Sequence, residues 1–496
     1  MTDRPEPAPP LDPAEPGWVW DRAALDQLTA ATARLSADLL QDARLGPVTR
    51  RPPASLIRRW QDAPVPAGGR PAGEVLAEFA ATVAPYPFGN AHPRFAAWVN
   101  APPHPLGVAA AALAAAMNPS VAGGNHAAVH LERQVARWFA GLAGWPDGHA
   151  GYLVSGGSAA TLSALAAARH RALSRAGHDV RRDGLAGCGE LAVYASAQAH
   201  SCVTKAVETL GIGSGQIRQV SCDGHRRLDP AALDRQLAAD RKAGRLPVAV
   251  VATAGTVNTG AVDPLGEIAA VCARHQAWLH VDGAYGGPAV LLLPEWEPER
   301  AGLALADSIG LDPHKWLYAP VDAGLVLFRD ENQARDAFSL VPSYLRTSGD
   351  PDEPAWFSEY GLEQTRPFRA LKVWMQLQHL GTSGYRRLIA RDIAVAAHLR
   401  DQITRAPDFE LLGHGLSVVC FRHLGTDTRG GHNLDARNER LLARLQRDGR
   451  AFLAGTEIDG RFALRACIIN PLTTTADTDA ILGEIRDCAE RRPRHT

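Results

Sequence analysis

Short, continuous apolar runs alternate with longer amphipathic segments between residues 91 and 365. Four of these runs are LAVYAS (191–196), VAVVATAG (248–255), AWLHVD (277–282) and AGLVLF (323–328), and DPAALDRQLAADRKAG and PLGEIAAVCARHQ are among the helical patterns between them. Strands that are apolar on both faces and separated by amphipathic helices are typical of a mainly parallel α/β sheet covered on both sides. Ligands of such sheets bind beyond the carboxyl ends of the strands, so the residues just after each run are the first candidates for a site.

The chain divides into three parts. Its 496 residues exceed the usual size of one hydrophobic core. Residues 1 to about 16 are Pro-rich and acidic, and two helical patterns follow them, DRAALDQLTAATARLSADLLQDA and AGEVLAEFAATVAP. After FRALKVWMQLQHLG (368–381), strands near LSVVCF (416–421) and FALRACII (462–469) indicate a smaller α+β unit. We predict an N-terminal arm and helical segment (1–90), a large domain (91–365) and a small C-terminal domain (366–496).

Charge and cysteine usage exclude several classes of protein. The formal net charge of -1 gives no electrostatic reason to expect nucleic acid or an anionic membrane as partner, so we expect a small-molecule ligand. The seven cysteines are scattered without a C-x-x-C pair, which argues against a disulfide framework and a zinc site and fits a reducing cytoplasm. No metal is expected. The longest apolar run, PLGVAAAALAAAM (105–117), is shorter than the roughly 20 residues that a membrane span needs.

Two candidate features are a glycine-rich turn and an acid at a strand end. Ser155–Ser158 reads SGGS at the mouth of a helical pattern, where free N–H groups and the helix dipole attract a phosphate, although the same letters also form ordinary capped loops. Asp282 ends a predicted buried strand. A carboxylate there needs a cation or a protonated heterocycle against it, unless it merely caps a turn.

Two further candidates are a histidine and a lysine. His200 follows another strand end, where its imidazole could stack on a flat ring, transfer protons or hydrogen-bond within the core. Lys315 lies in SIGLDPHKWLYAP, in a chain that carries most of its positive charge as arginine. A lysine amine becomes a nucleophile once it loses its proton, which an apolar or cationic neighbourhood promotes. The alternative is a surface lysine whose stem covers Trp316.

Taken together, the four features match one cofactor. Pyridoxal phosphate needs a phosphate site, a group that stacks on its ring, an Asp partner for its pyridinium nitrogen and a lysine that forms a Schiff base with its aldehyde. The sequence supplies one candidate for each requirement, and each follows an apolar run in the α/β pattern. We therefore expect pyridoxal 5'-phosphate as the cofactor.

The chain also resembles a known family. HPRF (92–95), SGGSAATLSAL, YASAQAHSCVTKA, VATAGTVNTGAVDPL, HVDGAYGG, DPHKW and FRALKVW occur in the order seen in the group II pyridoxal-phosphate decarboxylases, the aromatic-L-amino-acid and glutamate decarboxylase family. The resemblance spans residues 20 to 490. It implies the PLP-dependent transferase fold type I, with a mainly parallel seven-stranded sheet, and a homodimer with shared active sites in which the N-terminal helices take part in dimerisation.

The same resemblance implies roles for individual residues. Lys315 would form the Schiff base, Asp282 would partner the pyridinium nitrogen, and His200 would stack on the ring opposite Ala284. The remaining cofactor contacts would come from Gly157, Ser158 and His314 around the phosphate and from Thr253 near the phenolic oxygen or the lysine. The segment AFSLVPSYLRTSGDP (337–351) resembles a mobile catalytic loop whose tyrosine, here Tyr344, reprotonates the substrate carbon.

We therefore predict an L-amino-acid decarboxylase that releases carbon dioxide and an amine through a Lys315 Schiff base and a quinonoid intermediate. Related aldehyde synthases tend to carry Phe where Tyr344 stands, so Tyr344 favours the amine. The main alternative is a decarboxylation-dependent oxidative deaminase, or another Cα/Cβ lyase, acting on a modified amino acid of specialised metabolism. A nucleotide-binding module and an inactive scaffold are two further alternatives.

Two departures from the family pattern concern the pocket. After HPRF an aromatic pair is usual, whereas this chain reads AAWVNAPPHP, which makes Trp98 and Val99 the candidate substrate contacts and favours an aliphatic or a larger, decorated amino acid. Asp312 stands where Asn is frequent. An acid so close to the phosphate is unfavourable unless it points away or pairs with an arginine.

Overall fold

The computed structural model describes residues 20–340, 354–425 and 434–490, and Tyr344 lies outside them. A seven-stranded sheet forms its centre, in the order β1-β7-β6-β5-β4-β2-β3. Its strands are β1 (Ala150–Val154), β2 (Leu191–Ser196), β3 (Ile217–Val220), β4 (Leu246–Thr253), β5 (Trp278–Asp282), β6 (Ser308–Leu311) and β7 (Gly324–Phe328). Among these strands, β7 alone runs in the opposite direction to all the others. The predicted mainly parallel α/β sheet is therefore confirmed.

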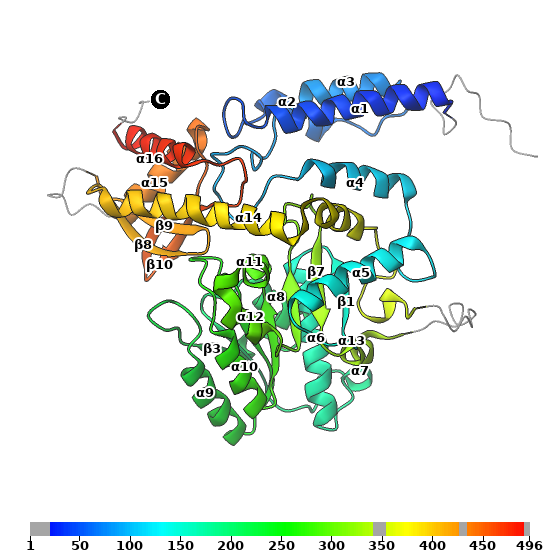
Figure 1. The fold of residues 1–496 in the computed structure, drawn as a ribbon, viewed down its shortest axis with the longest axis vertical. Helices are drawn as coiled ribbons and strands as arrows, with labels where there is room; N and C mark the ends of the chain where they lie inside the picture. The colour runs from blue at the N-terminus through cyan, green and yellow to red at the C-terminus, as the bar shows by residue number, and fades with distance from the viewer. Residues whose placement is uncertain (1–19, 341–353, 426–433, 491–496) are drawn as a thin grey trace, which may run out of the picture.

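Two groups of helices cover this sheet. In one group α6 packs across β4–β7 and contacts α8 and α13; in the other α10 packs on β4 and β5 and contacts α9 and α12 (Figure 1). The helices of the two groups are α6 (Gly157–Arg175), α8 (Cys202–Thr209), α9 (Pro230–Lys242), α10 (Leu265–Arg274), α12 (Glu297–Leu303) and α13 (Glu331–Phe338). Strands β2, β5, β6 and β7 are buried along their whole length, which explains their continuous apolar sequences.

A second, four-stranded antiparallel sheet has the order β10-β11-β9-β8. Its strands are β8 (Phe409–Gly415), β9 (Val418–His423), β10 (Ala454–Ile458) and β11 (Arg461–Cys467), and its helices are α14 (Ala370–Arg405), α15 (Leu434–Asp448) and α16 (Thr475–Glu490). This unit confirms the predicted smaller α+β part. The boundaries proposed at residues 90/91 and 365/366 remain a prediction.

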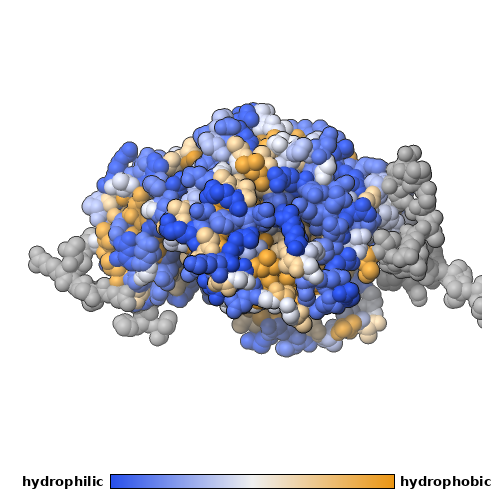
Figure 2. All heavy atoms as spheres, turned by 90° about the horizontal axis from the view of Figure 1, so that it is seen from below, coloured by the Kyte–Doolittle hydropathy of each residue, from blue (hydrophilic) through white to orange (hydrophobic). Residues whose placement is uncertain are grey.

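Three N-terminal helices lie together at one end of the molecule, above α4 (Pro105–Met117) in Figure 1. They are α1 (Arg22–Asp42), α2 (Ala54–Asp62) and α3 (Ala72–Thr82), and none of them contains a buried residue. Fourteen of the nineteen large hydrophobic side chains that the described residues expose lie between Trp20 and Met117. The opposite end of the molecule, shown in Figure 2, is mostly hydrophilic with small, scattered hydrophobic patches.

Helix α5 (Ala127–Leu142) packs on β1 and α14. The other helical segments are short and comprise α7 (Val180–Asp183), α11 (Gly287–Leu292), η1 (Ser214–Gln216), η2 (Pro294–Trp296) and η4 (Phe357–Glu359). Among the described residues, no helix combines the length and the hydropathy that crossing a bilayer requires.

Candidate active site

The carboxyl ends of the parallel strands meet at one cavity of about 370 Å³. Ser155 follows β1, Thr253 ends β4, Asp282 ends β5, Asp312 follows β6, and His200 lies four residues beyond β2. All five residues line the cavity. The topology therefore brings together polar groups that are far apart in the sequence, at the edge where ligands of such sheets bind.

The glycine-rich turn forms one wall of the cavity. The first i→i−4 hydrogen bond of α6 runs from the Ala160 N–H to the Gly156 carbonyl, so the N–H groups of residues 157–159 have no partner within the helix. A Cβ atom added to Gly157 would come within 3.0 Å of Ala284 Cβ, so glycine permits the close packing of this turn. Free N–H groups at the positive end of a 19-residue helix make this wall suitable for an anion.

Asp282 and Thr253 present oxygen atoms to the cavity from neighbouring strands. Asp282 is 8% exposed, and its Oδ1 accepts a hydrogen bond from the Ala284 N–H at 3.1 Å. Thr253 is 4% exposed, and its hydroxyl is buried without a hydrogen-bond partner among the described residues. A buried hydroxyl without a partner is costly unless a ligand completes it.

His200 contributes a flat and mainly neutral ring. Its Nδ1 accepts a hydrogen bond from the Cys202 N–H at 3.1 Å, which leaves the proton of the neutral ring on Nε2. Desolvation lowers the pKa of His200, and the nearby carboxylate of Asp282 opposes this shift without cancelling it. The imidazole is therefore suited to stacking rather than to acting as a permanent cation.

Lys315 lies on the turn that follows β6. Its Nζ is 3.0 Å from Asp312 Oδ2, and its side chain is 25% exposed. Burial lowers the pKa of Lys315, but attraction to Asp312 and Asp282 outweighs burial, and the net pKa is raised. We expected apolar or cationic surroundings that would promote loss of the amine proton. The structure instead places two carboxylates near Lys315, and they favour its protonated form.

Behind Lys315, a buried acid holds the segment in place. Trp316 Nε1 and the Tyr318 hydroxyl both donate to Asp392 Oδ2, at 3.0 and 2.9 Å. Asp392 belongs to α14 and has no exposed surface, and Tyr285 stacks on Trp316 at 5.0 Å between ring centroids. Sequence reasoning missed this acid because it lies 76 residues after Trp316, in an otherwise ordinary helix.

The buried acid gives a prediction about pH and stability. Burial raises the pKa of Asp392 to about 7, although the Trp316 and Tyr318 hydrogen bonds lower it. The folded protein then keeps this proton to a higher pH than the unfolded chain, so stability falls as pH rises from about 4 to about 7, by up to about 1.4 kcal/mol per pH unit. In Asp392→Asn the amide oxygen still accepts both bonds but does not titrate. We expect the thermal midpoint of the variant, relative to the parent, to rise between pH 5 and pH 8; parallel profiles would contradict this.

The structure brings most of the predicted site residues to this cavity. The predicted residues that line the cavity are Val99, Gly157, Ser158, His200, Thr253, Asp282, Ala284, His314 and Lys315. Trp98 lies outside the lining, 45% exposed and stacked on Phe88 at 5.5 Å, and its contact with substrate stays a prediction. Lining residues that sequence reasoning did not assign include Cys202 and Tyr285. Burial raises the pKa of Cys202 to about 12, so it is a neutral thiol.

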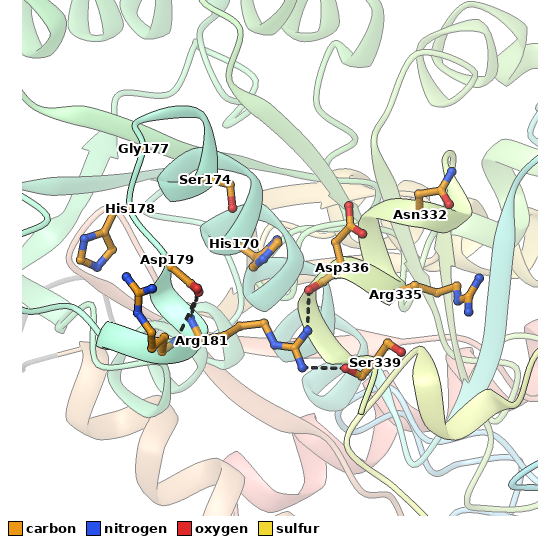
Figure 3. Close-up of a pocket in the computed structure, with 11 residues that line it drawn as sticks. His170, Ser174, Gly177, His178, Asp179, Arg181, Asn332, Arg335, Asp336 and Ser339 are labelled. Atoms are coloured by element: carbon orange, nitrogen blue, oxygen red, sulfur yellow. Dashed lines mark hydrogen bonds between the residues drawn. The ribbon is translucent and has the colours of Figure 1, made fainter. Parts of the chain in front are cut away.

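A larger hollow of about 1010 Å³ lies elsewhere, between α6, α7 and α13 (Figure 3). There the Arg181 guanidinium donates to the carbonyl oxygens of Asp336 and Ser339, and Asp179 accepts from the Arg181 N–H at the start of α7. These polar groups fix the end of α13. The lining contains no lysine, so the hollow offers no amine to an aldehyde cofactor.

The donors of the first cavity fit pyridoxal phosphate. The amino end of α6 suits its phosphate, Asp282 suits a protonated ring nitrogen, and Lys315 supplies the amine that the aldehyde requires. The Thr253 hydroxyl, which has no hydrogen-bond partner in the described ranges of the chain, supplies a further donor that a ligand oxygen would satisfy.

Comparison with known proteins adds independent findings. The family profile described as "Pyridoxal-dependent decarboxylase conserved domain" matches residues 53–424. An aromatic-L-amino-acid decarboxylase of Bacillus atrophaeus is 36% identical over 403 residues, covering 80% of this chain and 82% of the relative. A 4-hydroxyphenylacetaldehyde synthase of Rhodiola rosea is 30% identical over 373 residues, covering 73% and 74%. A crystal structure of Oryza sativa TDC with PLP and tryptamine is similar with a TM-score of 0.88 at 28% identity, covering 97% of this chain and 99% of that one.

Proposed function

The chain belongs to the pyridoxal-dependent decarboxylase family and is a pyridoxal 5'-phosphate-dependent amino-acid decarboxylase; from that premise we propose that it converts an L-amino acid to carbon dioxide and an amine at the cavity around Lys315. The main support for this proposal is the composition of the cavity. Lys315 shares a single cavity with Asp282, His200 and the amino end of α6, which together meet the four requirements of this cofactor.

Each wall of the cavity has a proposed task. The N–H groups at Gly157 and Ser158 bind the phosphate, together with His314, whose Nδ1 is anchored on the backbone of Ala323. Thr253 uses its free hydroxyl on the phenolic oxygen or on the lysine. Ala284 lines the cavity and would pack against the cofactor ring.

The reaction needs a place for an electron pair. When bound, the cofactor supplies that electron sink, because its protonated pyridine ring accepts the pair left when the bond to the carboxylate breaks. Asp282 keeps the proton on the ring nitrogen, and its near-complete burial strengthens this ion pair. Lys315 Nζ attaches the cofactor between turnovers. His200 lines the same cavity, where it would stack on the cofactor ring and orient the substrate carboxylate.

Tyr344 is proposed to complete the reaction by giving a proton to the substrate Cα after carbon dioxide leaves. We expect Tyr344→Phe to lower amine formation by about 10²-fold or more, the range for loss of a general acid. Dioxygen then intercepts the unprotonated carbon: amino acid, O2 and water become aldehyde, ammonia, carbon dioxide and hydrogen peroxide. The measurement is amine, aldehyde and peroxide per carbon dioxide released, with and without oxygen.

The parent enzyme distinguishes the two candidate functions in the same assay. The aldehyde-forming alternative is motivated by the similarity to the 4-hydroxyphenylacetaldehyde synthase. If the parent itself consumes oxygen and yields aldehyde with ammonia, the amine proposal is wrong. If Tyr344→Phe makes amine at the parent's rate, Tyr344 is not the proton donor.

Substrate class is tested by a scan of free and modified L-amino acids for carbon dioxide release. Val99 and Val257 line the cavity, and the residues around Val99 favour an aliphatic or decorated substrate. The similarity to an aromatic-L-amino-acid decarboxylase places tryptophan, tyrosine and phenylalanine in the same scan.

We also propose a homodimer through the N-terminal helices. Helices α1–α3 bury no residue of their own, and the exposed hydrophobic side chains gather between Trp20 and Met117, which is typical of a protein interface. Light scattering should give twice the chain mass of 52.9 kDa. A monomer at micromolar concentration would contradict the proposal.

A further inference from the structure

Asp312 is a buried acid that the proposed reaction does not use. Its side chain is 3% exposed, and its Oδ2 lies 3.0 Å from Lys315 Nζ and 3.8 Å from His314 Nε2. Its Oδ1 is buried and has no hydrogen-bond partner in the described part of the chain. A buried carboxylate oxygen in that state is costly unless a ligand completes its bonding.

The carboxyl group borders the anion-binding wall. A Cβ atom added to Gly157 would lie 3.1 Å from Asp312 Oδ2, and one added to Gly156 would lie 3.8 Å from Oδ1. The acid therefore faces the turn at which the proposed function places a phosphate. Two anions at such short range inside a protein repel each other far more strongly than in water.

The neighbouring titratable groups provide little compensation for a second anion. Lys315 offsets the charge of Asp312 while its amine is free, but attachment of the cofactor would leave this nitrogen with at most one of its three N–H donors. Desolvation lowers the pKa of His200, and burial raises the pKa of Cys202 to about 12, so both tend to be neutral. Asp282 adds a further negative charge, which leaves His314 as the other candidate cation facing Asp312.

We propose that Asp312 couples binding of the phosphate-bearing cofactor to the uptake of one proton. The carboxylate takes the proton from solvent as the phosphate arrives and then donates it in a hydrogen bond to a phosphate oxygen. The cavity thereby gains a neutral donor in place of an anion. This inference rests on the proposed function, because that function places the phosphate at the Gly156–Ser158 turn.

Calorimetry on the full-length, cofactor-free protein tests the inference. Titrations in buffers with different heats of ionisation report the protons taken up per site. With pyridoxal phosphate we expect the uptake to exceed that with 5'-deoxypyridoxal by about one proton. The deoxy compound lacks the 5'-hydroxyl that closes pyridoxal itself to a hemiacetal, so both ligands present a free aldehyde to Lys315 and the difference isolates the phosphate. Equal uptake for the two ligands would overturn the inference without the need for any variant.

The variant Asp312→Asn tests whether the extra proton binds to the side chain at position 312. Its amide N–H donates a hydrogen bond at every pH and does not titrate. We expect the extra uptake to disappear in the variant. The dissociation constant of the parent for pyridoxal phosphate should rise by up to about tenfold per pH unit in alkaline solution relative to that of the variant. If the extra proton uptake is unchanged in the variant, the proton binds to the ligand's own phosphate. That result would overturn the assignment to Asp312. Labelling of Lys315 by the cofactor is scored separately, so the proposed function and this inference can fail independently.

Discussion

Replacing Lys315 with alanine is expected to abolish the yellow colour of the purified enzyme and to lower decarboxylation by about 10⁴-fold or more, the range for loss of one member of a catalytic unit. The physical reason is that no other lysine lines the cavity described around residue 315. The chain has four lysines in all, at positions 205, 242, 315 and 372. The measurements are the visible spectrum and carbon dioxide release at saturating cofactor.

Two matched variants separate chemistry from folding. Lys315→Ala leaves Asp312 buried without its partner at 3.0 Å, which can destabilise the protein. Lys315→Arg keeps a cation beside Asp312 but offers no amine that an aldehyde can use, so it should fold and stay inactive. Lys242→Ala, on the exposed surface of α9, should behave as the parent. An active, yellow Lys315→Arg enzyme would contradict the role of Lys315.

Replacing Asp282 with asparagine is expected to leave the cofactor attached but to lower decarboxylation by about 10² to 10⁴-fold. The amide side chain is nearly isosteric with the carboxylate and can still accept the Ala284 N–H bond, which lies at 3.1 Å in the parent. It carries no negative charge, so it cannot hold a proton on the pyridine nitrogen. The loss should therefore appear in kcat more than in cofactor affinity.

The control is Asp282→Glu, which keeps the carboxylate at a shifted position and should recover part of the activity. The comparison needs the visible spectrum of each variant, which shows whether the cofactor is still attached. An Asp282→Asn enzyme with parental kcat would show that the ring nitrogen does not need this acid.

The sequence predicted the parts of the fold that burial dictates. LAVYAS at 191–196 coincides with β2, and the run at 277–282 contains β5, because both strands are buried on both faces. Strands β8 and β10 were not predicted, since FELLGHG and AGTEI mix polar residues with glycine at the edges of the second sheet. Helix α2, which begins directly after Pro53, was not among the two N-terminal helical patterns that we predicted.

The candidate site was predictable for a topological reason. Residues that follow parallel strands meet at one edge, so Asp282 and His200 could be grouped without coordinates. Thr253 was implied only by the family resemblance. Contacts across the molecule were not predictable in the same way. Asp392 reaches Trp316 from α14, and the pairing of Asp312 with Lys315 depends on how the turn after β6 closes.

The role of Lys315 is tested most directly by reduction of the native enzyme with borohydride, followed by digestion and mass mapping of its four lysines. Reduction fixes a pyridoxyl group on whichever amine holds the cofactor. We predict that the label is found at Lys315 and at no other lysine. A label at Lys205, Lys242 or Lys372, or no label on a catalytically active enzyme, would contradict it.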